Sequence, residues 1–148
     1  MSGYSDIEAL WLTRVRAVAG FDANNTSRGD WNILNSGASE VYVILKPGSH
    51  SRDMLTWRNR QNVWQTIIEM WQLYRNDGTT LTTLEANYNT LLAALDQYPR
   101  LGDTGNTVQQ GQVTAVNEVV QSPPDAPQWL VAQLIGTVNE EITINFQE

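Results

Sequence analysis

The sequence predicts an α+β domain in which a four-stranded, mainly antiparallel sheet carries two helices on one face, in the chain order α-β-β-α-β-β. Residues 81–98 place apolar side chains three and four positions apart, which is typical of an amphipathic helix. Residues 62–75 are rich in β-branched and aromatic side chains, and the apolar residues of 138–146 share alternate positions. Short connections favour antiparallel pairing, with the helices as a second layer.

Length and composition indicate one domain spanning residues 1–148. A chain of 148 residues with 41% hydrophobic and 17% charged residues can bury a core of its own. The absence of cysteine excludes disulfides, thiolate metal ligands and a cysteine nucleophile. No signal peptide or transmembrane run is recognisable, so we expect no membrane partner.

The net charge of −7 is distributed unevenly along the chain. Residues 1–76 carry eight Arg and Lys against seven Asp and Glu, whereas residues 77–148 carry Arg100 against nine acids. An acidic chain is a poor candidate for wrapping nucleic acid, because the phosphates repel it. It could still line a passage through which DNA moves without binding.

The first third of the chain predicts a helix, a loop and a short strand. Ser5 and Glu8 have capping-box spacing ahead of an apolar stripe, which predicts a helix from about residue 6 to residue 19. Residues 21–39 are rich in turn formers and are expected to be a loop, attached to the body through Trp31. Residues 41–45 (VYVIL) read as a short strand.

A long basic connection is predicted at residues 46–61, between the first two strands. It carries one histidine, one tryptophan, one acid and four basic residues: His50, Trp57, Asp53, Lys46, Arg52, Arg58 and Arg60. We expect it to project from the sheet as a loop. Residues 62–75 then fit either a helix or a strand, and we favour the strand because no capping signal precedes this β-branched and aromatic run.

The second half of the chain predicts one helix and two or three strands. A turn at 76–78 leads into the helix at 81–98, which Thr82 and Glu85 would cap and Pro99 would end. The remaining elements follow in order: a loop at 99–111, a strand at 112–121, a rigid turn at 122–127, and one long or two short strands over 129–146, with Gly136 marking a bulge or bend.

Signatures of catalysis are missing from the sequence. His50 is the single histidine, and a lone histidine in a loop is most often solvated. Glu140 and Glu141 are adjacent, so a strand would point them to opposite faces. Neither a phosphate-binding glycine loop nor a metal-ligand cluster is recognisable. We therefore expect no enzyme and no cofactor, while a small carboxylate-dependent enzyme and a monomeric binding module with an aromatic patch remain alternatives.

Four segments resemble the tail terminator (tail completion, neck) proteins of long-tailed bacteriophages, a family that includes the terminator of phage lambda. They are RNRQNVW entering the aromatic strand, IIEMWQLYRNDGTTL turning into a helix, LLAALDQYPRL ending that helix, and the closing WLVAQLIGTVNEEITINF. Together with the α-β-β-α-β-β layout, the resemblance covers most of the chain. Head-completion and stopper proteins of the same neck are the nearest alternatives.

The resemblance implies a structural protein of the virion, assembled in the host cytoplasm. Such proteins form a ring, usually a hexamer, on the last ring of the tail tube, stop tube growth and offer a surface to the head connector. DNA would pass through the lumen without specific binding. From the residues themselves we predict that self-association uses edge strands, aromatic residues outside the monomer core and the basic connection, with these candidates: Trp31, Lys46, Arg52, Trp57, Arg58, Arg60 and Trp129.

Overall fold

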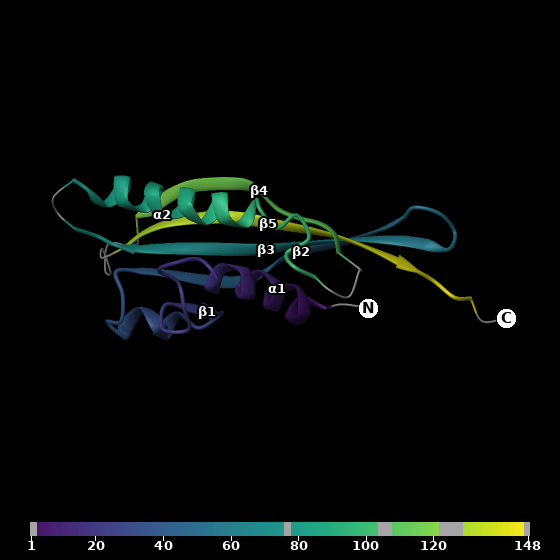
Figure 1. Ribbon diagram of the computed structural model, residues 1–148, viewed down its shortest axis with the longest axis horizontal. Helices are drawn as coiled ribbons and strands as arrows, with labels where there is room; N and C mark the ends of the chain where they lie inside the picture. Colours follow the sequence, from purple (N-terminus) through teal and green to yellow (C-terminus); the bar gives the residue numbers. More distant parts are fainter. Residues whose placement is uncertain (1–2, 76–77, 104–107, 122–128, 147–148) are drawn as a thin grey trace.

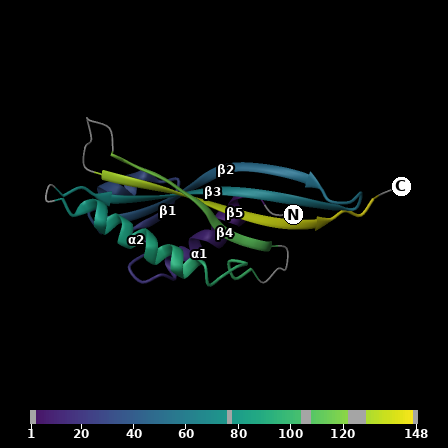
Figure 2. The same cartoon turned by 90° about the horizontal axis from the view of Figure 1, so that it is seen from above.

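The computed structural model describes residues 3–75, 78–103, 108–121 and 129–146. They form one sheet with two helices, α1 (Tyr4–Arg16) and α2 (Thr80–Leu95). Both helices lie on the same face of the sheet, α1 over β1 to β3 and α2 over β3 to β5 (Figures 1 and 2). The predicted α+β class with both helices on one face is therefore confirmed. Residues 76–77 of the turn predicted at 76–78, and the whole turn predicted at 122–127, lie outside the described residues.

The sheet has five strands, where the sequence predicted four. In spatial order they run β1-β2-β3-β5-β4, and neighbours are antiparallel except β1, which is parallel to β2. The long strands occupy these ranges: β2 Val41–Met54, β3 Asn59–Leu73, β4 Val108–Gln121 and β5 Trp129–Thr143. The ambiguous segment at 62–75 is thus a strand, and the closing segment is one strand rather than two.

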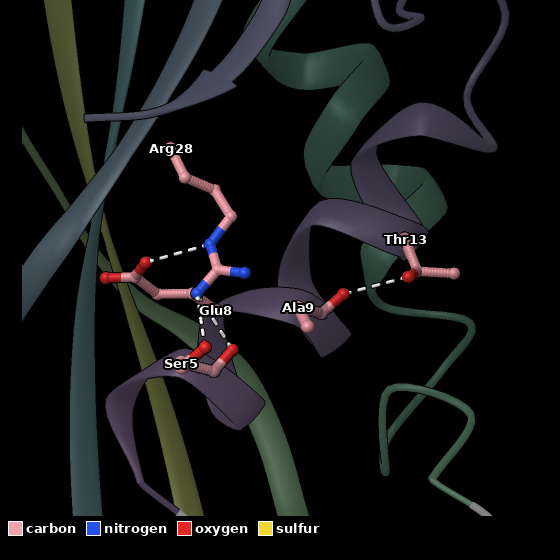
Figure 3. Close-up of polar contacts among 5 residues, drawn as sticks. All are labelled: Ser5, Glu8, Ala9, Thr13 and Arg28. Atoms are coloured by element: carbon pink, nitrogen blue, oxygen red, sulfur yellow. Dashed lines mark hydrogen bonds and ion pairs between the residues drawn. The ribbon is translucent and has the colours of Figure 1, made fainter. Parts of the chain in front are cut away.

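Strand β1 (Thr26–Arg28) lies in the segment that the sequence predicted to be a loop. These three residues show no apolar alternation, so the local sequence does not predict a strand. The position of β1 depends instead on contacts with other elements. The Arg16 guanidinium holds Thr26 by two hydrogen bonds of 2.7 and 3.1 Å. The Arg28 guanidinium pairs with the carboxylate of Glu8 at 3.1 Å and donates to Ser5 (Figure 3). Helix α1 therefore holds β1 against the edge of β2.

Both helices begin and end a few residues earlier than predicted, and neither predicted capping box forms. The amide of Gly3 donates to Asp6 at the start of α1, while Glu8 turns to Arg28 instead of the helix start. The N-cap of α2 is Thr79. The spacing of Ser5 and Glu8 cannot show that Glu8 pairs with Arg28 instead, because Arg28 comes from a distant part of the chain.

The core lies between the two helices and the facing side of the sheet. Helix α1 contributes Ile7, Trp11 and Val15, and α2 contributes Leu84, Leu91 and Leu95, all buried. The predicted apolar stripe of α2 is confirmed at these three leucines. The prediction is wrong for Leu81, which is 47% exposed. The helix start extends beyond the core, so its first apolar residue faces solvent.

Strand β3 is the central strand and alternates between two faces. The helix-facing residues Trp64, Ile68 and Met70 are buried in the core. On the opposite face, Ile67 and Trp71 are only half-buried, because α1 and α2 both pack on the other side of the strand. The doubly apolar pattern that predicted a long strand thus reflects one core face and one partly covered face.

The predicted basic loop at 46–61 is wrong in form, because most of it is strand. β2 continues to Met54 and β3 begins at Asn59, so only residues 55–58 connect them. The paired ladder continues through His50↔Trp64 to Met54↔Arg60, after one irregularity near Pro47. The polar composition of this stretch is typical of a loop. Its backbone groups are instead hydrogen-bonded between the two strands, so the stretch forms a hairpin.

Gly136 has a packing role rather than the predicted bend in its own strand. The β3–β5 register is unbroken at Thr66↔Gly136, and the nearest irregularity lies on β4, between Val113 and Ala115. A Cβ built on Gly136 would stand 2.7 Å from Cζ2 of Trp11. Glycine is therefore required so that the indole of α1 can lie directly on the sheet.

Candidate assembly interface

A three-stranded ribbon projects beyond the two helices at one end of the molecule (Figure 1). It consists of the outer parts of β2 and β3 together with the end of β5, which pairs with β3 as far as Asn59↔Thr143. We call residues 54–60 of this ribbon, together with Phe146, the hairpin tip. The Ile144 amide donates to the Arg58 carbonyl at 2.6 Å and holds the chain beyond β5 beside the tip.

The hairpin tip exposes a cluster of large apolar side chains. Exposed fractions are 69% for Met54, 50% for Leu55, 64% for Trp57 and 50% for Phe146. Trp57 stacks on Phe146 with ring centroids 5.0 Å apart and 17° between the planes. Clustered exposed apolar side chains of this kind mark interaction surfaces, unlike single exposed ones.

Basic groups surround this apolar cluster and hold its loop. The Arg60 guanidinium donates to the carbonyls of Thr56 at 2.9 Å and Trp57 at 3.2 Å, which pre-organises the turn. The Arg58 guanidinium lies 5.0 Å from the centroid of the Trp57 ring. Arg52 is exposed on the neighbouring strand. The predicted candidates Arg52, Trp57, Arg58 and Arg60 are therefore brought together at one end of the fold.

Two other predicted candidates lie elsewhere and already have partners within the chain. The Lys46 ammonium pairs with the buried carboxylate of Glu69 at 3.2 Å, and the Trp31 indole N–H donates to the same carboxylate at 3.2 Å. Gln133 donates to it at 3.3 Å. Lys46 and Trp31 therefore serve a polar cluster that joins β2, β3, β5 and the 3₁₀ helix η1 (Trp31–Asn35).

Trp129 also lies apart from the hairpin tip. Its half-buried ring meets Tyr42 and Trp71 edge-on, with centroids 5.7 and 6.3 Å apart. Edge-to-face aromatic contacts of this kind stabilise the packing of a monomer. The seven predicted interface residues therefore divide between a shared site at the tip and positions within the body.

The root of the ribbon contains a polar group that the sequence analysis did not single out as a site. The His50 ring stacks on Trp64 at 3.6 Å, and its Nε2 lies 3.2 Å from Oδ1 of Asn62. Asn62 in turn donates to the fully buried carboxylate of Glu140 at 3.4 Å. His50 is exposed, as predicted, although its ring contacts Trp64, whereas Glu140 is fully buried and does not lie at a solvated edge. Pairing of β3 with β5 places them together, and local spacing carries no signal for it.

The end of the molecule opposite the hairpin tip carries a hollow of about 260 Å³ between the end of β3 and the start of α2. It is lined by Glu40, Gln72, Leu73, Arg75, Thr79, Thr80 and Thr83. Glu40 and Arg75 form an ion pair across it. Tyr74 and Leu81, adjacent in sequence to lining residues, are 40% and 47% exposed. We call this feature the end hollow.

The described residues contain no group of three or more His, Asp and Glu that could hold a metal ion. Neither described helix is long and apolar enough to cross a bilayer.

The architecture defines a class of fold that is known from a contractile assembly. It is similar to the sheath/tube terminator of an extracellular contractile injection system, PVC, determined by cryo-EM in the extended state, with a TM-score of 0.58 and 15% sequence identity. The match covers 99% of this chain and 58% of that chain. No protein-family model and no curated protein matches the sequence. The expected tail-terminator type of fold is thus supported at the level of structure.

Proposed function

We propose that this protein is a structural subunit that ends a tail tube. The observation that carries the proposal is the match of 99% of the chain to the fold of a sheath/tube terminator. The exposed apolar tip of a projecting ribbon supports it, since a monomeric protein gains nothing from keeping such side chains in water.

The proposed form is a hexameric ring, as the family resemblance implies, at the head-proximal end of the tube. Its partners would be further copies of itself, the tail tube protein and the head connector or stopper. DNA would pass through the lumen without specific binding, which agrees with the net charge of −7. The place of action would be the neck of the virion, reached by assembly in the host cytoplasm.

The proposal predicts a specific effect on tube length. Purified protein added to growing tail tubes should bind one end as a ring and stop further growth, because it covers the surface that the next tube subunit needs. The measurement is the distribution of tube lengths in negative-stain images, with and without the protein.

The same experiment separates a terminator from a stopper or head-completion protein. A stopper would leave tube growth unchanged and would bind only tubes that are already ended, or the head. Tubes that grow equally long in both conditions, with no density at either end, would exclude the terminator function.

A further inference from the structure

The hairpin tip stands at the far end of the ribbon, beyond both described helices (Figure 1). Within the ribbon, β3 and β5 pair without a break as far as Asn59↔Thr143. The third strand, β2, is different, because its pairing with β3 is interrupted at the root of the ribbon, between Pro47 and His50. The outer part of β2 is thus separated from its inner part at the point where the ribbon leaves the body.

This interruption is a β-bulge at which two backbones approach closely. Gly48 and Ser49 of β2 stand opposite the single residue Gln65 of β3. A Cβ built on Gly48 would lie 2.8 Å from the carbonyl oxygen of Gln65, so a larger residue would force the strands apart. A bulge bends its strand and increases the local twist. The regular pairing of the inner strand therefore does not by itself set the direction of the outer strand.

The first residue of α1 contacts this bulge directly. The Tyr4 hydroxyl donates to the carbonyl of Gly48 at 2.8 Å. The Tyr4 ring meets Trp64 edge-on, with centroids 5.0 Å apart, and its centroid lies 6.2 Å from that of His50. His50, on the outer side of the bulge, stacks on Trp64 at 3.6 Å. We call Tyr4, Trp64 and His50 the aromatic clamp, since they join α1 to β2 on both sides of its bulge.

The aromatic clamp rests on buried groups of the other two strands. Trp64 belongs to the hydrophobic core and is only 4% exposed. Beyond it, Oδ1 of the fully buried Asn62 lies 3.2 Å from Nε2 of His50. The Asn62 amide donates in turn to the carboxylate of Glu140 on β5 at 3.4 Å. Contacts at the root therefore run from α1 across all three strands of the ribbon.

We propose that the aromatic clamp fixes the direction in which the ribbon projects, and that the ribbon pivots at the bulge when the clamp is loosened. A tip that is held in one direction would bind a partner without the ordering cost that a mobile arm incurs. The inference concerns the free subunit and goes beyond the proposed function, so it does not depend on whether the protein ends tail tubes.

The absence of native cysteine permits a direct test with paired spin labels. Met54→Cys places one label on the hairpin tip, and Asn89→Cys places the other on an exposed position of α2. Double electron–electron resonance then measures the distribution of distances between the tip and the body. The parent should give one narrow distribution. Tyr4→Phe, which removes only the donated hydrogen bond, should broaden it, and Tyr4→Ala, which also removes the ring, should broaden it further.

Tyr42→Phe is the matched control for the loss of a tyrosine hydroxyl. That hydroxyl accepts from the amide of Ser39 at 3.0 Å, at the inner end of the same strand β2. The control should therefore leave the distances between tip and body unchanged. A second pair of labels, on Asn89→Cys and Val116→Cys, lies wholly on α2 and β4 and should keep its distribution in every variant.

Hydrogen exchange provides an independent readout of the same contact. The backbone amides of residues 50–54 should exchange about fivefold faster in Tyr4→Phe than in the parent, the change expected for the loss of one hydrogen bond. In Tyr42→Phe these amides should exchange at the parent rate.

Two results would overturn the proposal. One is a distribution between tip and body that stays narrow in Tyr4→Ala, or in Tyr4→Phe where Tyr4→Ala does not fold, together with unchanged exchange of residues 50–54. The other is equal broadening in Tyr42→Phe, or broadening of the Asn89–Val116 pair as well, since the effect would then be a general loosening of the fold. All of these measurements use the free subunit, so a failure of the terminator function would leave their meaning unchanged.

Discussion

Gly136 shows how one residue adjusts the contact between layers. The Trp11 indole of α1 lies where a Cβ on this strand position would be, at 2.7 Å from its Cζ2 atom. An indole that touches the sheet backbone brings α1 closer than an ordinary side-chain contact would. The residue therefore belongs to the core, although it has no side chain of its own.

Gly136→Ala should lower the free energy of unfolding by about 1–3 kcal/mol, because an added methyl overfills a close-packed core. Chemical denaturation monitored by tryptophan fluorescence measures the change. Trp11→Leu is the matched second variant, since it removes the ring that the methyl would meet. The double variant should then lose less than the sum of the single losses. An additive double variant would show that Trp11 is not the obstacle.

Glu69 shows a different use of single residues, namely a buried charge with several partners. Its carboxylate accepts from Lys46, Trp31 and Gln133, which come from three different elements. A buried carboxylate is tolerated when it is paired and hydrogen-bonded. This cluster gives Lys46 and Trp31 partners within the monomer, while Trp31 remains 39% exposed.

Helix α2 is the element whose sequence pattern and structural role agree best. Its buried leucines face the sheet, and its first leucine faces solvent beyond the core. The same substitution should therefore change the free energy of unfolding much more at a buried leucine of this helix than at its exposed first leucine.

Leu91→Ala should lower the free energy of unfolding by about 2–5 kcal/mol, because it removes apolar contacts and leaves a cavity. Leu81→Ala, the same change on the same helix, should alter it by only about 0.5 kcal/mol, since surface substitutions rarely do more. Unfolding midpoints in denaturant give both values. Equal losses at the two positions would contradict the packing of α2 described above.

The whole molecule differs in chemistry between its two ends. The hairpin tip carries exposed apolar and basic side chains at one end, whereas the end hollow at the other contains the Glu40–Arg75 ion pair. Attraction between exposed charges is screened by salt, over a Debye length that falls from about 10 Å at 0.1 M to about 3 Å at 1 M.

Under the proposed function, binding of the protein to tube ends through the basic hairpin tip should therefore weaken when the salt concentration is raised over this range. Arg58→Ser should reduce this dependence, because one of the steering charges is then absent. The measurement is the fraction of tube ends that carry the protein in negative-stain images at the two salt concentrations. A fraction independent of salt, or an unchanged dependence in Arg58→Ser, would show that charge at the tip does not steer binding.

The candidate site was partly visible in the sequence. Arg52, Trp57, Arg58 and Arg60 were correctly expected in one projecting segment, because aromatic and basic residues without an apolar period indicate exposed surface. Phe146 was not expected there, since it lies far away in sequence and reaches Trp57 only through the pairing of β3 with β5. The end hollow could not be predicted either, because it forms where separate elements end.

The sequence by itself determined the α+β class and the two helices, and it favoured a strand over a helix at the centre of the sheet. These features follow from periodicity and side-chain shape, which act between residues near one another in the chain. Only the tertiary structure decided that 26–28 is a strand, that 46–54 extends a hairpin, and that Lys46 belongs to Glu69. Each of these depends on hydrogen bonds or charges from distant segments, so no local pattern records them.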